Sequence, residues 1–501
     1  MSTVRLQVGT EEIAADDDVT IDQGNQRCSR SPDPCIAGGT AATIGRQPHD
    51  PHGWSKLAEH GCCVIGGAII HDDDLVGPVG QYLIHEGPQT LFEEIGLIVG
   101  GDDNAQIHGR TRFPLCTVPC YHPGEDTRMR VWFLARRHMP FSPASVARRP
   151  LGGGESALYY VAKGLAGLGH EVVVINRCGA EAGVYDGVRY YDAAAGSQWH
   201  SAARAKPPDV LVICRAMEDV RTGIGARARL FWSHDYQGVP MAPLRSGVGY
   251  QLSIAWRRAT GPLFHQRVDR IIVISAFLAD VFRWLFRVPA DKLVVVPVGI
   301  DSHAFAGSAA PHSPLRFVHT SVPDRGLAPL LEDIFPAIRA QSPEAELHVY
   351  SYQSLDAFRR CATPGVSLNG WAPKPDLVRS LQQSTLMLYP ATVEETGCIA
   401  VLESMAAGTP AVTSSLGVLP ELAADGRRGI AVEGWPGRGD FSARFVDTTM
   451  QLLSDPNRLA QMRMAAHDYA ITHHAWDAIA LRWEQVLQAT LDRASRQQLR
   501  E

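Results

Sequence analysis

Residues 385–415 read TLMLYPATVEETGCIAVLESMAAGTPAVTSS, which is an apolar strand pattern, a loop, a short helix and a second strand pattern. The helix is predicted to run from about Cys398 to Ala407, because Gly408 is a good left-handed cap and Pro410 prevents continuation. A strand, a helix and a further strand in this order are the repeating unit of α/β proteins.

Glu403 is the unusual residue of this segment. Helical neighbours lie three and four residues apart, so Ile399, Leu402 and Ala406 form one apolar stripe, and Glu403 lies at its edge. An ionised carboxylate there is costly unless another group takes up its charge or its hydrogen bonds. Either the helix lies at the surface and Glu403 points into water, or Glu403 has a partner in a binding site.

Apolar strands alternating with helices continue in both directions from this segment. They begin at residue 128 with a strand, a helix that carries Leu158, Val161 and Leu165 on one face, and a second strand. Near-continuous apolar strands of this kind predict parallel sheets covered on both faces. The strands are predicted at MRVWFLA (129–135), EVVVI (171–175), DVLVICRA (209–216), RLFWSHD (229–235), RIIVIS (270–275), KLVVVPVG (292–299), LRFVHTS (315–321), AELHVYS (345–351), TLMLYP and PAVTSS.

A linker-like stretch, SHAFAGSAAPHSP from Ser302, divides these strands into two series. The prediction is an α/β fold of two Rossmann-like domains in tandem, residues 128–305 and 306–470, with a C-terminal helix at 471–501. Residues 1–127 form an N-terminal extension that is partly disordered and has no assignable fold, although CCVIGGAII and IGLIVGG suggest short strands. The two domains should leave a cleft between the carboxyl ends of their strands.

Composition excludes several classes of function. The chain has 501 residues, is 45% hydrophobic and 20% charged, and has a net charge of −6, which gives no support for a nucleic-acid partner. No apolar run approaches the roughly 18 to 20 residues that span a bilayer. The first residues lack the layout of a signal peptide, so we expect a cytoplasmic protein whose cysteines are reduced.

Many potential metal ligands precede residue 128, but none of them has the spacing of a known metal motif. A zinc or non-haem iron site in this region stays open as the alternative, but we expect no metal site and treat these residues as structurally neutral. They are Cys28, Cys35, Cys62, Cys63, Cys116, Cys120, His49, His52, His60, His71, His85, His108 and His122.

The second series of strands concentrates the candidate site residues. Glu395 lies in the loop before the helix and Glu403 lies within it, while Gly397, Cys398 and Ile399 form the helix N-terminus. Free N–H groups and the helix dipole make that end an anion site, and glycine allows a ligand to approach the backbone. A diphosphate bound there would place the hydroxyls of a ribose beside Glu403.

Arg325 follows the first strand of the second series, where its guanidinium could hold phosphate oxygens. The alternative for an arginine in a turn is a solvated charge.

These motifs, taken in order, resemble the group 1 glycosyl transferases, a retaining family with the GT-B fold. The family signature is an acidic residue, seven intervening residues, a glutamate and a small-residue run ending in Gly-Thr-Pro, which here is ETGCIAVLESMAAGTP. GVLPELAADGRRG, VDRIIVISAFLADVF, KLVVVPVGIDSHAF and LNGWAPKPDLVRSLQQSTLMLYP also match the family, so the similarity extends from about Met129 to Trp483.

The resemblance implies roles for these residues in binding a nucleotide sugar. Glu403 would bind the donor ribose, Glu395 would contact the transferred sugar near its reacting carbon, Arg325 would hold the diphosphate, and residues 397–399 would hold sugar and phosphate. Asn369, Gly370 and Trp371 match the segment that borders the nucleobase, although Trp371 could also be an ordinary packing residue.

In the first domain, Gly152, Gly153 and Gly154 match the family's glycine loop and His234 matches a histidine of the cleft, close to the reacting sugar or acceptor. A histidine after a strand is also a plausible polar contact in any α/β protein. Two departures from the family pattern are Val298, where asparagine is common, and Thr320-Ser321, where Gly-Arg is usual.

The implied reaction is transfer of a sugar from a nucleotide diphosphate sugar to an acceptor hydroxyl, with retention and without a metal or other cofactor. The acceptor could be a glycan, a lipid-linked molecule or a small molecule. A nucleotide-sugar epimerase and a non-catalytic relative that binds nucleotide sugars stay open as alternatives. FLADVFRWLFRV, with Arg257, Arg258, Arg267 and Arg270 nearby, could contact a membrane peripherally, but its stripe of Leu278, Val281, Phe282 and Leu285 favours a helix packed in the core.

Overall fold

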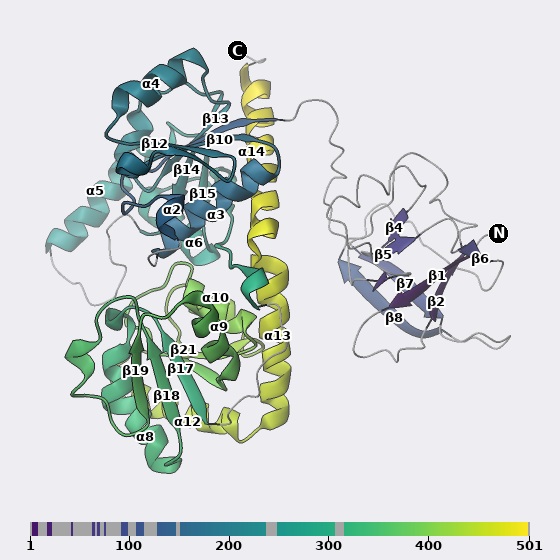
Figure 1. Cartoon of the computed structure of the whole chain (residues 1–501), viewed down its shortest axis with the longest axis vertical. Coiled ribbons are helices and arrows are strands. Elements are labelled where there is room, and N and C mark those ends of the chain that lie inside the picture. The colour runs from purple at the N-terminus through teal and green to yellow at the C-terminus, as the bar shows by residue number, and fades with distance from the viewer. Residues whose placement is uncertain are drawn as a thin grey trace. The chain divides into compact units, whose positions relative to one another are not determined.

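The computed structural model describes residues 128–146, 151–236, 248–305 and 315–498, and eight strands before residue 128 by their backbone (Figure 1). The chain divides into two compact units, residues 1–127 and 128–501. The strands of the first unit are β1 (Thr3–Val8), β2 (Asp18–Asp22), β3 (Ala42–Thr43), β4 (Cys63–Ile65), β5 (Ala68–Ile70), β6 (Leu75–Val76), β7 (Phe92–Ile98) and β8 (Ile107–Pro114).

Strands are thus present at both places where short strands were predicted in the extension, as β4, β5 and β7. The side chains of the cysteines and histidines before residue 128 lie outside the described residues.

The second unit contains two sheets, as the alternation of strands and helices predicts. All neighbours in the first sheet are parallel except β11 and β12, which form an antiparallel hairpin at its edge. In spatial order the first sheet is β11 (Gly183–Tyr185), β12 (Val188–Asp192), β10 (Glu171–Asn176), β9 (Arg130–Leu134), β13 (Val210–Cys214), β14 (Ala228–Ser233), β15 (Arg270–Val273) and β16 (Leu293–Val295).

The second sheet is parallel throughout. Its order is β19 (Val366–Gly370), β18 (Glu346–Tyr350), β17 (Arg316–Thr320), β20 (Leu386–Tyr389), β21 (Ala411–Ser414) and β22 (Gly429–Val432). The central strands of both sheets are buried except for a half-buried arginine at the start of β9 and of β17, because helices cover both faces. Two parallel sheets, each wound with helices, confirm the predicted pair of Rossmann-like domains.

Helices connect the strands of both domains (Figure 1). In the first domain they are α2 (Pro143–Val146), α3 (Gly153–Gly167), α4 (Gly196–Ala205), α5 (Val248–His265) and α6 (Ala276–Phe286). In the second domain they are α7 (Leu327–Pro329), the π-helical turn η8 (Leu330–Ile334), α8 (Phe335–Gln341), α9 (Lys374–Gln383), α10 (Ile399–Ala406), α11 (Leu419–Ala423), α12 (Phe441–Leu453) and α13 (Pro456–His474).

The apolar stripe of α6 is fully buried, which confirms that this helix packs in the core of the first domain. No helix in the described ranges is long and apolar enough to cross a membrane.

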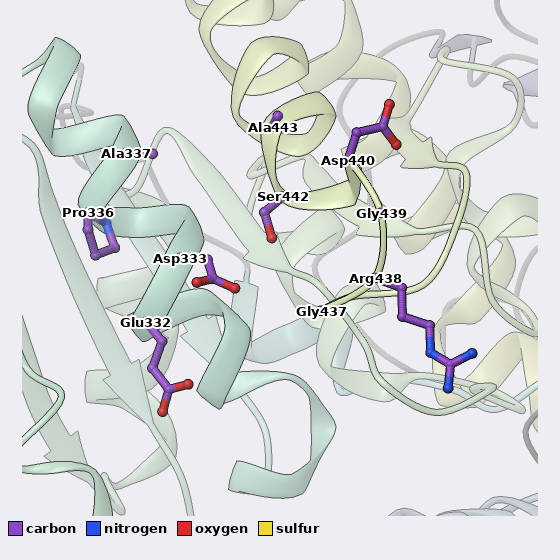
Figure 2. Close-up of a pocket in the computed structure, with 10 residues that line it drawn as sticks. All are labelled: Glu332, Asp333, Pro336, Ala337, Gly437, Arg438, Gly439, Asp440, Ser442 and Ala443. Atoms are coloured by element: carbon purple, nitrogen blue, oxygen red, sulfur yellow. The ribbon is translucent and has the colours of Figure 1, made fainter.

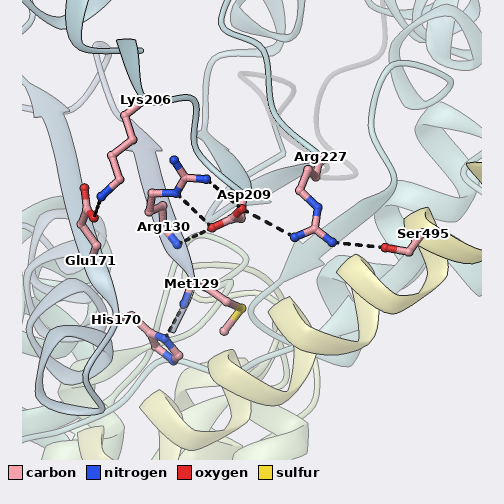
Figure 3. A network of polar contacts seen from close by, with 8 residues as sticks. All are labelled: Met129, Arg130, His170, Glu171, Lys206, Asp209, Arg227 and Ser495. Atoms are coloured by element: carbon pink, nitrogen blue, oxygen red, sulfur yellow. Dashed lines mark hydrogen bonds and ion pairs between the residues drawn. The ribbon is translucent and has the colours of Figure 1, made fainter. Parts of the chain in front are cut away.

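The last helix, α14 (Trp476–Gln498), packs on the first domain rather than on the second. Its Trp483 is completely buried, with ring centroids 5.9 Å from Phe133 and 4.6 Å from Trp232 of the first sheet. Near the end of the helix, Ser495 accepts a hydrogen bond from Arg227, which also pairs with Asp209 at the start of β13 (Figure 3). The chain's end therefore completes the core of its first α/β domain.

The chain crosses between the domains at two places that touch each other. Ile300 donates a hydrogen bond to the carbonyl of His474 at 2.6 Å, and Trp476 donates to the carbonyl of Ile300 at 3.2 Å. The imidazole of His474 also lies 2.8 Å from the carbonyl oxygen of Val298. The outgoing and returning segments are thus joined side by side.

Candidate active site

The loop between β20 and α10 has a special backbone conformation. Cys398 adopts a left-handed conformation (φ 42°) immediately before α10, and Gly408 adopts another (φ 70°) just after it. The predicted helix and its glycine cap are therefore confirmed. The loop is also tied to Gly417, where a Cβ atom would lie 2.1 Å from the carbonyl oxygen of Glu395, so only glycine fits there.

Glu395 is buried and holds two partners through one carboxylate oxygen. Arg325 donates to it at 2.6 Å, and the Tyr389 hydroxyl donates to it at 2.7 Å. Burial and the charge of Glu395 raise the pKa of Tyr389 well above its usual value, so this phenol remains a donor. Burial disfavours the charge on Arg325, but the carboxylate of Glu395 outweighs this and raises the pKa of the guanidinium.

Ser321, one of the two residues that depart from the family pattern, belongs to the same network. Its hydroxyl lies 3.2 Å from that of Tyr389, whose proton is engaged by Glu395, so Ser321 is the donor. The small side chain supports the tyrosine that orients Glu395.

Glu403 is paired with Lys374, at the start of α9. The lysine ammonium also lies 5.7 Å from the ring centroid of Phe305, which is buried. The Glu403 side chain is 17% exposed, so it points neither freely into water nor into the core. The partner of Glu403 in this structure is thus a lysine.

Gly370 is the last residue of β19 and Trp371 follows it, three residues before Lys374. Gly370 has a left-handed backbone (φ 69°), and Trp371 is 53% exposed. Trp371 is therefore not a buried packing residue, and the Lys374–Glu403 pair brings its loop close to α10.

His234 lies at the end of β14 and is buried, and neither of its ring nitrogens has a hydrogen-bond partner among the described residues. Burial, with smaller contributions from His138 and Arg215, lowers the pKa of His234 well below its usual value, so the ring is neutral. The ring of His138, which is completely buried, meets it edge-on with centroids 5.9 Å apart.

Glu155, in the first turn of α3, is a buried carboxylate beside these imidazoles. It lies 3.4 Å from Nδ1 of His138 and accepts a hydrogen bond from the Met139 N–H at 2.9 Å. Burial opposes its charge, but these contacts prevail and lower the pKa of Glu155 to about 2. A Cβ atom at Gly154 would come within 3.6–3.8 Å of His138, Arg215 and His234, which places the glycine loop against them.

Predicted residues of the two domains meet where the domains contact each other. A Cβ atom at Gly153 would lie 3.3 Å from Cδ1 of Ile399, and the Thr396 hydroxyl donates to the carbonyl of His234 at 2.7 Å. The Glu421 carboxylate of α11 accepts from the N–H groups of Ala276 at 3.2 Å and Phe277 at 2.5 Å, and so caps α6 of the first domain.

The sequence suggested that Gly397 lets a ligand approach the backbone. In the structure, its close neighbours are side chains of the first domain. A Cβ atom there would lie 2.8 Å from Ile274 and 3.3 Å from Val298, both in the first domain. A larger residue at this position would have to displace the tip of the Ile274 side chain, because the two domains touch there. The apolar Val298 suits that contact, which gives a physical reason for the second departure from the family pattern.

Sequence reasoning missed Lys374, Tyr389, His138, Glu155 and Arg215. Glu155 carried a usable signal, because it is an acidic residue in the first turn of an otherwise apolar helix. Arg215 ion-pairs with Asp235 at 2.6 Å and has a left-handed backbone (φ 63°). No sequence pattern predicted either feature.

A separate cavity of about 660 Å³ lies between η8 and the segment that leads into α12 (Figure 2). None of its lining residues is a predicted site residue; they are Glu332, Asp333, Pro336, Ala337, Gly437, Arg438, Gly439, Asp440, Ser442 and Ala443. Within the described ranges, no group of three or more His, Cys, Asp or Glu side chains is arranged to hold a metal ion.

Comparison with known proteins identifies both domains. A model of the family described as Glycosyl transferases group 1 matches residues 316–455, and one described as Glycosyltransferase Family 4 matches residues 151–304. The structure is similar to sucrose-phosphate synthase from Thermosynechococcus elongatus, with a TM-score of 0.56 and 16% identity over 72% of this chain and 99% of that one.

Curated relatives match parts of the chain. An alpha-maltose-1-phosphate synthase from Mycolicibacterium smegmatis is 26% identical over 48% of this chain and 68% of its own length. A D-inositol 3-phosphate glycosyltransferase from Thermobispora bispora is 33% identical, but only over 26% of this chain and 29% of its own length. With matching models in both domains and the GT-B fold, the chain belongs to the group 1 glycosyl transferases.

Proposed function

We propose that this chain transfers a sugar from a nucleotide diphosphate sugar to an acceptor hydroxyl, with retention at the anomeric carbon and without a metal. The observation that carries the proposal is the convergence of Arg325, Glu395 and the start of α10 opposite Gly153 and His234. Cation, carboxylate and helix N-terminus together suit a leaving diphosphate and the sugar attached to it.

In the proposed reaction, the bond between the anomeric carbon and the diphosphate oxygen breaks, and the acceptor oxygen bonds to the same face of that carbon. The acceptor proton passes to the departing phosphate oxygen. Arg325 and the N–H groups of residues 397–399 stabilise the negative charge of the diphosphate, while Glu395 orients the sugar. The neutral imidazole of His234 offers a hydrogen bond to a sugar or acceptor hydroxyl.

Glu403 is assigned to the ribose hydroxyls, which would replace Lys374 as its partner. Trp371, exposed at the end of β19, offers a face to the nucleobase. The epimerase and the binding-only relative gain no support from the matched family.

A thermal-shift screen against UDP, GDP, ADP, dTDP and their sugars tests the donor site. A ligand at about 100 times its dissociation constant stabilises a protein by roughly 2.7 kcal/mol. We expect one nucleotide to raise the midpoint of the wild type and of Glu332→Ala, a control in the separate cavity, but not that of Glu403→Ala. A shift that survives in Glu403→Ala would contradict the assignment of the ribose.

Product analysis with the nucleotide that binds tests the chemistry. We expect a glycoside with the anomeric configuration of the donor, formed equally well in EDTA. An inverted product, an epimerised nucleotide sugar or loss of activity in EDTA would each overturn the corresponding part of the proposal.

A further inference from the structure

The three most exposed large apolar side chains of the described residues all belong to one helix, α5. Leu252 and Trp256 are each 64% exposed, and Leu263 is 60% exposed. They are spaced by four and seven residues, so they form a single stripe along the helix. Figure 1 shows α5 on the flank of the first domain that lies away from α14.

The opposite face of α5 is fixed in the domain. Ile254 and Phe264 are buried, and a Cβ atom at Gly261 would lie 2.2 Å from the carbonyl oxygen of Phe286 at the end of α6. The helix therefore cannot rotate to bury its exposed stripe without losing a close contact with α6.

The charge around this stripe is opposite to that of the whole chain. Residues 248–268 contain three arginines and no Asp or Glu, whereas the chain has a net charge of −6. Arg267 is exposed and lies four residues beyond Leu263, just after the end of α5. Arg258 lies 5.4 Å from the ring centroid of Trp284, which is itself 45% exposed.

We propose that α5 docks the first domain on an anionic lipid bilayer. Leu252, Trp256 and Leu263 enter the boundary between headgroups and acyl chains, and Arg267 contacts lipid phosphates. A second copy of the chain on the same stripe would bring two sets of arginines together without acidic partners, so lipid suits the charge better.

The proposal corrects the place of lipid contact suggested by the sequence. The membrane interpretation placed the contact on FLADVFRWLFRV and the nearby arginines, but the apolar stripe of that helix, α6, is buried, as the core alternative predicted. The exposed apolar surface belongs to the preceding helix, whose N-terminal half was not considered.

Co-sedimentation of the full chain with vesicles provides the test. We expect binding to phosphatidylcholine vesicles that contain phosphatidylglycerol and much weaker binding to phosphatidylcholine alone. Replacing Leu252, Trp256 and Leu263 by serine should weaken binding at least about 100-fold, because the apolar area that enters the bilayer is lost. Arg267→Gln should weaken it about fivefold, and high salt should have a similar effect.

A control variant carries Met464→Ser and Leu481→Ser, which change side chains that are 56% and 48% exposed on α13 and α14. It should bind as the wild type does. If the triple variant does not fold, Trp256→Phe supplies a second readout: the wild type should show a blue-shifted tryptophan emission on anionic vesicles that this variant lacks.

Equal binding by the triple variant and the wild type would overturn the proposal. So would a chain that ignores vesicles and instead forms a dimer that the triple variant disrupts. Neither outcome bears on sugar transfer, which can be measured separately with a water-soluble acceptor.

Discussion

The polar groups that the two domains bring to the candidate site differ in whether they have partners. In the second domain, each glutamate of the signature has a cationic partner: Arg325 for Glu395 and Lys374 for Glu403. In the first domain, neither ring nitrogen of the buried His234 has a hydrogen-bond partner among the described residues, whereas Nδ1 of His138 lies 3.4 Å from Glu155. The glutamates of the second domain therefore have partners within the protein, and the imidazole of His234 in the first domain does not.

This difference determines what a ligand has to do on each side. A ligand that reaches Glu403 exchanges one partner for another, so its net gain is small. A ligand that reaches the imidazole of His234 supplies missing hydrogen bonds, and a buried polar group without a partner costs about 1–3 kcal/mol. We therefore expect the first domain to add affinity once the cleft is filled, and the second to control which ligand enters.

The largest expected effect comes from removing the aromatic side chain that joins α14 to the first domain. Trp483→Ala should lower the free energy of unfolding of that domain by about 3–5 kcal/mol, because the ring is completely buried. Urea unfolding measures it, with Leu481→Ala, an exposed position on the same helix, as control. A loss below about 1 kcal/mol would mean that α14 is not part of that core.

Arg325→Ala tests the second domain, where Arg325 is the partner of Glu395. Removing the cation should lower kcat by about 10²–10³-fold, because the departing diphosphate loses a preorganised partner. Steady-state kinetics with the donor identified in the screen measures this effect. Arg438→Ala, in the separate cavity, should behave as the wild type, and Arg325→Lys should recover part of the rate. Unchanged turnover in Arg325→Ala would exclude the arginine from the reaction.

Glu155→Gln tests the first domain through the pH dependence of its stability. The pKa of Glu155 is lowered from 4.5 to about 2, so its stabilising contribution is complete above pH 4.5 and is lost as the pH falls toward 2. With solvent screening, we expect about 1–3 kcal/mol. The variant should be less stable at neutral pH and should show less loss of stability over this acid range. Glu344→Gln, an exposed position, should keep the wild-type acid profile; the same profile in Glu155→Gln would refute the assignment.

Lys374→Met should have the smallest effect. The Lys374–Glu403 pair is partly exposed, so its loss should change the unfolding free energy by less than about 1 kcal/mol. Nucleotide affinity, measured by calorimetry, should increase a few-fold, because the ribose no longer competes with the ammonium group. Weaker binding would show instead that the lysine itself contacts the ligand.

Most of the fold was predictable, because buried parallel strands are nearly continuous apolar runs. The edges were harder. The β11–β12 hairpin was missed although Asp186-Gly187, both with positive φ, is a common hairpin turn. β19 was missed because its residues are at most half-buried and alternate with exposed ones, so they do not form an apolar run.

The site was predictable where a motif is local and unpredictable where contacts are distant. Glu395, Glu403 and residues 397–399 lie within one short segment, so their spacing was informative. Lys374 lies 29 residues from Glu403, and Tyr389 acquires its role from Ser321 and Glu395 together. Such partners depend on how the strands are ordered in the sheet, which no local pattern specifies.

The paired crossings at Ile300 and His474 restrict how the two domains can move. Segments that are hydrogen-bonded to each other act as a single pivot, so relative translation would break both bonds while rotation preserves them. Any rotation that separates the domains must also release Glu421 from the N-terminus of α6, so that cap acts as a latch between the domains.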